Sequence, residues 1–300
     1  ITLAQMEVRA GRPDLNLEKI LKTIETKRTR GAEILVFPEM AVSGYLLGDE
    51  WENESFLKEL QEANEIIKVA SKEMVVIWGN VDVDWSLKGE DGRVRKYNAV
   101  FVAQNGKLLG KSYKTLMPKY REFDDERHFY SLQKLALERN QKIENILQPF
   151  EVEIRGEKIK LGLMLCEDMW DADYAIKPSQ ILVNNGAEIL INISCSPWTL
   201  GKNDKRHRVV KEIVRKTGVP FYYCNNTGSQ NNGKNIFVFD GASTAYNKNG
   251  EIEFQEQVFD DLHSALVFGI KKFFETLSSK KVVIGLSGGV DSAVSACLLV

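Results

Sequence analysis

The chain has 300 residues and a mass of 34.0 kDa, which allows two domains or one large α/β unit at about 150 residues per domain. With 43% hydrophobic, 9% aromatic and 27% charged residues, the composition excludes disorder, collagen-like repeats and low complexity. Forty Lys and Arg against 42 Asp and Glu give a net charge of −2, so no overall basic field attracts nucleic acid or an anionic membrane.

Cysteine usage and the absence of targeting patterns indicate a reducing compartment. The four cysteines are far apart and form no CxxC pair, which argues against a zinc ribbon, a redox dithiol or a disulfide scaffold. They are Cys166, Cys195, Cys224 and Cys297. The chain opens on ITLAQMEVRA, without a basic segment that leads into an apolar stretch, and no run approaches about 18 apolar residues. We therefore expect a cytoplasmic protein with no membrane span.

The first 255 residues alternate short β-rich runs with amphipathic helical patterns, which predicts a layered α/β domain with mixed sheets. Strands are expected at 34–37, 74–78, 98–102, 159–165, 188–193, 221–224 and 236–239. Helices are expected at 15–30 behind a capping Asp14, at 56–70, and at 205–216 before Gly218. The pairs Asn105-Gly106, Arg155-Gly156 and Asn249-Gly250 predict hairpin turns.

The sequence changes character near residues 255–262, so we predict two domains, 1–258 and 259–300. The second part is expected to contain a helix at 262–277, a polar turn at 278–281, a buried strand at 282–286, a glycine-rich loop and an apolar helix that runs to Val300. A strand, loop and helix of about 40 residues cannot bury their own faces. We therefore expect the natural protein to continue well beyond Val300.

Three reactive side chains are expected at the ends of strands, where α/β folds collect their chemistry. Glu39 follows the run 34–37 and Pro38, Lys114 lies in the stretch 111–123, and Cys166 follows the apolar run 161–165. Each alone has an ordinary reading: a surface carboxylate, a solvated amine and an inert buried thiol. Together they supply a base, a cation for an oxyanion and a nucleophile, which can cleave a C–N bond through an acyl-enzyme.

Other reactive patterns carry less weight. Gly110-Lys111-Ser112 is not a phosphate-binding P-loop, because Asn105 stands where the motif needs glycine. The histidines lie in charged or helical contexts, and we expect structural or surface roles for them. They are His128, His207 and His263.

The segments FPEMAVSGY, KxxxPxYREF and GLMLCEDMW, in this order, resemble the nitrilase superfamily, and specifically the glutamine amidotransferase domain of glutamine-dependent NAD synthetases. The resemblance covers roughly residues 1 to 255. It implies an αββα sandwich in which Glu39 is the general base, Lys114 stabilises the tetrahedral intermediate and Cys166 forms the thioester. It also implies that glutamine is bound by Tyr120, Glu167 and Ser194, and that Cys195 and Cys224 are packing residues.

The run Ser287-Gly288-Gly289-Val290-Asp291-Ser292 follows the last expected strand and opens a helix. Glycines, hydroxyls and a helix N-terminus suit an anion, although a buried glycine turn is the plain alternative. SGGVDS resembles the pyrophosphate-binding loop of the ATP pyrophosphatase family. The resemblance implies ATP binding by Ser287, Gly288, Gly289, Asp291 and Ser292, with Asp291 as a ligand of Mg²⁺.

A nitrilase-type domain joined to this loop resembles a two-site ligase. Glutamine would be hydrolysed at Cys166, and ammonia would attack an adenylated nicotinate adenine dinucleotide to give NAD, AMP, pyrophosphate and glutamate. The resemblance further implies an internal ammonia tunnel and a homo-oligomer, with no nucleic-acid or membrane partner. Two alternatives remain: a stand-alone nitrilase-type amidase or carbamoylase, and a binding protein that kept the sandwich without turnover.

Overall fold

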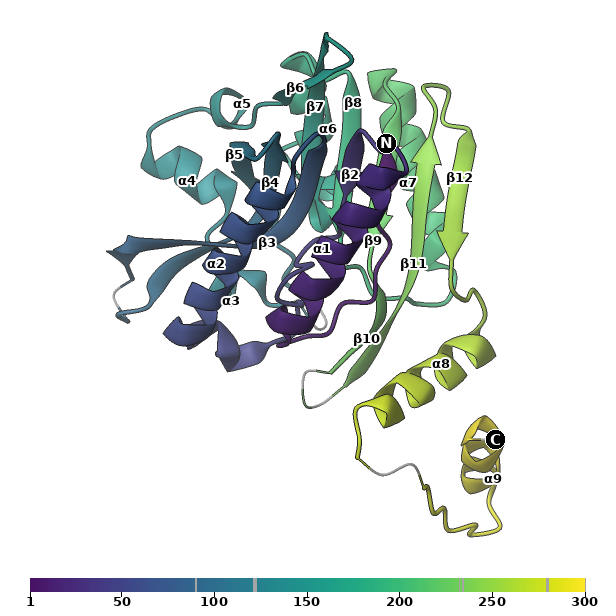
Figure 1. Cartoon of the computed structure of the whole chain (residues 1–300). Helices are drawn as coiled ribbons and strands as arrows, with labels where there is room; N and C mark the ends of the chain where they lie inside the picture. Colours follow the sequence, from purple (N-terminus) through teal and green to yellow (C-terminus); the bar gives the residue numbers. More distant parts are fainter. Residues whose placement is uncertain (90, 121–122, 232, 234, 279–280, 300) are drawn as a thin grey trace.

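The computed structural model describes residues 1–89, 91–120, 123–231, 233, 235–278 and 281–299. Their strands form two sheets that pack face to face, with helices on the two outer faces (Figure 1). This four-layered αββα sandwich confirms the predicted fold class. No helix among these residues is both long enough and apolar enough to cross a membrane.

The first sheet has the order β1-β2-β3-β4-β5. Strands β1, β2 and β3 run parallel, and β4 and β5 continue antiparallel. The bounds are β1 Thr2–Leu3, β2 Ile34–Val36, β3 Val75–Lys88, β4 Val94–Gln104 and β5 Lys107–Tyr113. Helices α1 (Pro13–Thr29) and α2 (Glu54–Ala70) cover its outer face (Figure 1).

The second sheet has the order β10-β11-β9-β8-β7-β6, and β12 pairs with β11. Strands β7, β8 and β9 are parallel, and the other pairs are antiparallel. The bounds are β6 Phe150–Ile154, β7 Glu157–Leu165, β8 Ile189–Ser194, β9 Phe221–Asn225, β10 Thr227–Asn231, β11 Ile236–Tyr246 and β12 Ile252–Gln257. Helices α6 (Pro178–Asn184) and α7 (Lys202–Thr217) pack on its outer face.

Short helical segments connect these elements near the ends of the strands. The α-helical ones are α3 Asp125–His128, α4 Leu132–Glu138 and α5 Ile143–Ile146. The 3₁₀ turns are η1 Gly48–Glu52, η2 Cys166–Met169 and η3 Asp171–Asp173.

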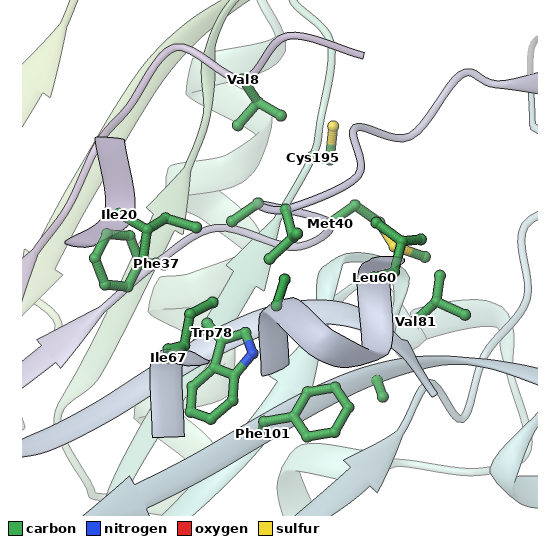
Figure 2. Close-up of a cluster of buried hydrophobic side chains, with 14 of the residues drawn as sticks. Val8, Ile20, Phe37, Met40, Leu60, Ile67, Trp78, Val81, Phe101 and Cys195 are labelled. Carbon is green, nitrogen blue, oxygen red and sulfur yellow. The ribbon is translucent and has the colours of Figure 1, made fainter. Parts of the chain in front are cut away.

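Three apolar clusters give the sandwich its layers. Between the sheets, side chains such as Val36, Ile77 and Leu163 form a dry interior, as expected for two sheets that face each other. Under the first pair of helices, Trp78 of β3 stacks on Phe101 of β4 with ring centroids 5.4 Å apart. Figure 2 shows Ile20 of α1, Ile67 of α2 and these two rings in one cluster.

The predicted helices and turns are largely confirmed. The helix predicted at 15–30 begins at Pro13 instead, so Asp14 lies in its first turn and does not cap it; Arg12 is the N-cap residue and pairs with Asp14. Asn53 caps α2, and Gly218 ends α7 with φ of 70°. The predicted turns join β4 to β5, β6 to β7, and β11 to β12.

The C-terminal segment contains α8 (Leu262–Glu275) and α9 (Val290–Leu299), as predicted. Helix α8 packs on β10 and β11, and α9 lies against α8 outside the sandwich (Figure 1). The buried strand predicted at 282–286 is wrong, because this stretch is irregular and exposed. No strand among the described residues pairs with it, and a lone strand leaves its backbone groups without partners. The predicted polar turn falls partly on 279–280, outside the described residues.

Candidate active site

Glu39 lies in the turn that follows β2, and hydrogen bonds to β3 fix this turn. Gly79 N donates to Pro38 O at 3.1 Å, and Ala41 N donates to Gly79 O at 2.9 Å. A Cβ on Gly79 would lie 2.5 Å from Cα of Glu39, so only glycine permits this approach. The turn therefore delivers the Glu39 carboxylate into the interior, where the residue is 0% exposed.

Lys114 follows β5 and is likewise 0% exposed. Its Nζ donates to Glu39 Oε1 at 2.9 Å and to Asp125 Oδ2 at 2.8 Å, and it lies 3.2 Å from the hydroxyl of Tyr45. Burial lowers the pKa of Lys114, but the carboxylates of Asp125 and Glu39 outweigh burial and raise this pKa well above its usual value. The ammonium group consequently stays charged inside the protein.

Cys166 begins the 3₁₀ turn η2 directly after β7. Its φ is 44°, in the left-handed region that residues with a side chain rarely adopt. Burial, and after it the charge of Glu39, raises the pKa of the Cys166 thiol, while Lys114 opposes this shift. A shift in this direction favours the protonated thiol, so a nucleophilic role for this sulfur would need a base to remove its proton.

Asp168 joins the turn after Cys166 to the segment that follows β5. Its Oδ1 accepts hydrogen bonds from Thr115 N at 3.0 Å and Leu116 N at 2.8 Å, and its Oδ2 accepts one from Leu165 N at 3.1 Å. Burial raises the pKa of Asp168 to about 7, against the opposing effect of these donors. One buried carboxyl thus fixes the relative position of the two segments that carry the amine and the thiol.

Two of the residues predicted to bind glutamine contact each other. The Tyr120 hydroxyl donates to Glu167 Oε2 at 2.8 Å, and Tyr174 donates to Oε1 at 2.9 Å. Burial raises the pKa of Glu167. Tyr120 and Tyr174 also line a cavity of about 400 Å³ together with Leu116 and Met117. The two tyrosines thus connect this cavity to Glu167, which directly follows Cys166 in the chain.

Ser194, the third residue predicted to bind glutamine, is buried at the end of β8. Its hydroxyl donates to Asn192 Oδ1 at 2.6 Å, and Asn192 Nδ2 donates to the carbonyl of Cys166 at 3.3 Å. The structure therefore places Ser194 two hydrogen bonds from the backbone of Cys166.

The site contains polar contacts that sequence reasoning missed. Asn98 Nδ2 donates to Glu39 Oε1 at 2.7 Å, and Cys195 N donates to Glu39 Oε2 at 2.8 Å. Asp125 and Tyr45 contact Lys114 as described above. An Asn inside an apolar run, as Asn98 is in 97–103, is a usable signal of a buried polar role, whereas nothing local distinguishes Asp125.

The side chains of two further cysteines and two histidines have partners outside the Glu39–Lys114 pair. Cys224 donates from Sγ to the carbonyl of Val36 at 3.3 Å in the interior between the sheets, and Cys195 lies in the outer cluster under α1 and α2. His128 contacts Glu52, and His207 contacts the Tyr246 hydroxyl.

Residues 287–292 form the end of a loop and the first turn of α9, away from the sandwich (Figure 1); all but the half-buried Ser292 are exposed. Gly288 has φ of 83°, and Cβ atoms on Gly285 and Gly288 would meet nothing within 4 Å. The hydroxyls of Ser287 and Ser292 lie 3.1 Å apart. The loop thus offers two hydroxyls, open backbone and the carboxylate of Asp291 to solvent.

The fold and the buried acid, amine and thiol define the class of protein. The chain matches the carbon-nitrogen hydrolase family model over residues 1–257 and belongs to that family. Residues 262–300 match the NAD synthase model. The first match covers the sandwich, and the second covers α8, the exposed loop and α9.

Individual relatives and solved structures resemble the chain over nearly its whole length. A glutamine-dependent NAD(+) synthetase from Synechocystis is 27% identical over 100% of this chain and 57% of its own length. The structure of glutamine-dependent NAD+ synthetase from Acinetobacter baumannii with ADP is 25% identical, with a TM-score of 0.80 over 99% of this chain and 56% of that one. An amidase of the nitrilase superfamily from Nesterenkonia, at 16% identity and a TM-score of 0.66, shares the fold. The chain thus spans just over half the length of the synthetases it matches, and these relatives confirm the predicted resemblance.

Proposed function

We propose that this chain is the glutamine-hydrolysing part of a glutamine-dependent NAD synthetase. The observation that carries the proposal is the buried Glu39–Lys114 pair, 2.9 Å apart, whose charges act on the thiol of Cys166. The relatives that match the whole chain support the choice of glutamine as the amide.

In the first half of the reaction, Glu39 takes the proton from Sγ of Cys166. The sulfur attacks the carboxamide carbon of glutamine, and the carbonyl oxygen becomes an oxyanion. The ammonium of Lys114, which is fixed between two carboxylates, stabilises that charge. When the tetrahedral intermediate collapses, the C–N bond breaks, the nitrogen takes the proton from Glu39, and ammonia leaves a thioester on Cys166.

In the second half, water attacks the thioester. Glu39 removes a proton from the water, and Lys114 again faces the oxyanion. The C–S bond breaks, the sulfur recovers its proton, and glutamate leaves. The buried position of all three side chains excludes bulk water and strengthens these electrostatic effects.

We further propose that glutamine enters through the cavity of about 400 Å³ that Tyr120 and Tyr174 line, because both tyrosines contact Glu167. The Glu167 carboxylate, fixed by the hydroxyls of Tyr120 and Tyr174, suits the ammonium group of an amino acid. Ser194 is the weaker candidate for the amino-acid end, because its hydroxyl is already bonded to Asn192.

We propose that residues 287–292 bind ATP. In this second reaction ATP would activate the acceptor, and ammonia would be the nucleophile that attacks it. The residues fit this ligand in kind: Ser287 and Ser292 carry hydroxyls, and the backbone at Gly288 and Gly289 is open to solvent. Ser287 N donates to Ser292 Oγ and Ser292 Oγ donates to Gly289 O, so binding would exchange these partners for phosphate oxygens. Among the described residues no group of three or more His, Cys, Asp or Glu side chains could bind a metal. Asp291 would therefore give Mg²⁺ one ligand, and the phosphates of ATP would give others. The ion would neutralise part of the charge on those phosphates.

The wider assignments rest on the same resemblance. We propose nicotinate adenine dinucleotide as the acceptor, a homo-oligomer as the assembly and the cytoplasm as the compartment. The free thiols of Cys166, Cys195, Cys224 and Cys297 agree with a reducing compartment.

The match of residues 262–300 to the NAD synthase model weighs against a stand-alone amidase or carbamoylase. That alternative makes a different prediction: simple amides would be hydrolysed better than glutamine. A binding protein without turnover would leave Cys166 inert toward an electrophilic glutamine analogue.

The test compares wild type with Cys166→Ala and a matched control, Cys224→Ala, which removes a buried thiol that bonds to the carbonyl of Val36 between the sheets. Ammonia release from glutamine, asparagine and propionamide is measured, together with covalent labelling by a diazoketone analogue of glutamine. The proposal predicts glutamine as the best substrate, label on Cys166, and loss of both only in Cys166→Ala. Equal turnover of propionamide, or label elsewhere, would contradict it.

A further inference from the structure

Gln230 of β10 is 2% exposed, and both polar atoms of its amide have partners. Its Oε1 accepts hydrogen bonds from the backbone N of Tyr45 at 2.9 Å and of Leu46 at 3.2 Å. Its Nε2 donates to Sγ of Cys195 at 3.4 Å. A satisfied amide in the interior fixes the distance between the segments it joins.

Each of the two segments that Gln230 joins also contacts one member of the Glu39–Lys114 pair. The Tyr45 hydroxyl lies 3.2 Å from Nζ of Lys114 and donates to Asp125. On the other side, Cys195 N donates to Glu39 Oε2 at 2.8 Å. Gln230 thus lies one residue from the general base and one residue from the cation, although it touches neither.

The segments of Tyr45 and Cys195 are not joined by regular secondary structure. Tyr45 and Leu46 belong to the irregular segment between β2 and η1, and Cys195 follows the last residue of β8, so no strand ladder connects them. Cys195 is one of the labelled side chains of the apolar cluster in Figure 2, and its Sγ accepts the hydrogen bond from Gln230 Nε2. The two segments are thus joined on one side by the Glu39–Lys114 pair itself and on the other by the amide of Gln230.

We infer that Gln230 is a positioning residue for amide hydrolysis: it fixes the distance between Glu39 and Lys114 by joining the segments of Cys195 and Tyr45. This inference rests on the proposed function. It differs from a packing role, because a packing residue contributes stability alone, whereas Gln230 contributes to kcat through the placement of the base and the cation.

The test uses the full-length protein with Gln230→Met, which keeps the length of the side chain and removes both hydrogen-bonding groups. The matched control is Asn64→Leu. Asn64 is also a buried amide: it lies on the inner face of α2, accepts from Trp78 Nε1 at 2.8 Å and from Asn80 Nδ2 at 2.9 Å, and donates to the carbonyl of Val81. Glutamine kcat and KM, the unfolding midpoint, and the rate at which iodoacetamide alkylates Cys166 are measured for each variant.

Gln230→Met is expected to lower kcat by about 10-fold to 100-fold, since a displacement of about 1 Å in an active site costs about 100-fold. KM stays within about twofold, because the groups that bind glutamine are untouched. The alkylation rate of Cys166 falls in parallel. Asn64→Leu loses comparable stability but keeps kcat and the alkylation rate of wild type.

Equal kcat and alkylation rates in Gln230→Met and Asn64→Leu would overturn the inference. A change confined to KM would also overturn it. Should Gln230→Met fail to fold, Gln230→Glu retains the acceptor for Tyr45 and Leu46, and a wild-type kcat in that variant contradicts a role for the donor to Cys195. If wild type releases no ammonia from glutamine, the proposed function fails separately, and the alkylation rates alone decide the role of Gln230.

Discussion

Lys114→Met tests the electrostatic core of the site most sharply. The substitution keeps a side chain of similar length and removes the cation that lies 2.9 Å from Glu39 and 2.8 Å from Asp125. Both carboxyls are then left buried without a cationic partner, since the lysine is 0% exposed and the two acids share it. We expect Lys114→Met to abolish turnover and to destabilise the fold.

Breaking a buried ion pair by removing one partner costs about 3–5 kcal/mol. The matched control is Lys111→Met on β5. Its Nζ lies 2.7 Å from Asp82, but the lysine side chain is 40% exposed, and such a pair contributes about 0–1 kcal/mol. Both variants replace a lysine by methionine, three residues apart in the chain. The difference between their losses in unfolding free energy therefore measures the effect of burying the ion pair.

Urea unfolding at about pH 7 and about pH 5 measures both effects. In wild type the pKa of Lys114 is raised above its usual 10.5, so the stability it contributes is complete below that value and is lost only as pH rises through the higher, folded-state pKa. Both pH values lie below that raised pKa, so the stability that Lys114 contributes in wild type is complete at both. Equal losses in the two variants at both pH values would refute the reasoning.

Three further predictions follow from the same geometry. Tyr120→Phe removes a donor to Glu167 and should raise KM for glutamine by about 5-fold to 50-fold with kcat little changed, as charged hydrogen bonds contribute about 1–2 kcal/mol; a kcat defect at constant KM would contradict this. The pKa of Asp168 is raised from its usual 3.8 to about 7 in the folded protein, so between these two pH values the native state holds a proton that the unfolded chain has lost. The free energy of unfolding should therefore fall as pH rises from about 4 to about 7. Asp168→Asn should flatten that part of the pH dependence in calorimetry, and an unchanged slope would count against it. Asp291→Ala in the full-length protein should stop AMP production and spare glutamine hydrolysis; unaltered ligation would remove the metal assignment.

The elements that the sequence predicted well have local causes. The strand at 34–37 is a continuous apolar run, and Asn105-Gly106 and Arg155-Gly156 both adopt positive φ in tight hairpins. The strand at 282–286 failed because pairing decides a strand, and no described strand lies beside it. Asp14 failed as a cap because Pro13 is itself a favourable first helical residue.

The residues of the candidate site also differ in whether a local sequence pattern points to them. Glu39, Lys114 and Cys166 could be proposed from the sequence because each stands at a strand end within a motif, and their catalytic roles stay predictions. Gln230 and Asp125 were not, because their importance comes from contacts across the fold: Gln230 reaches Tyr45 over 185 residues of sequence. No local pattern predicts such a contact.

The most direct measurement of the central claim is NAD formation by full-length Cys166→Ala with two nitrogen donors. The account predicts that glutamine no longer supports NAD formation, whereas ammonium salts support it at the wild-type rate, because only acyl transfer needs the sulfur. NAD formation from glutamine in this variant, or loss of both activities in a folded protein, would contradict the assignment of Cys166 as the nucleophile.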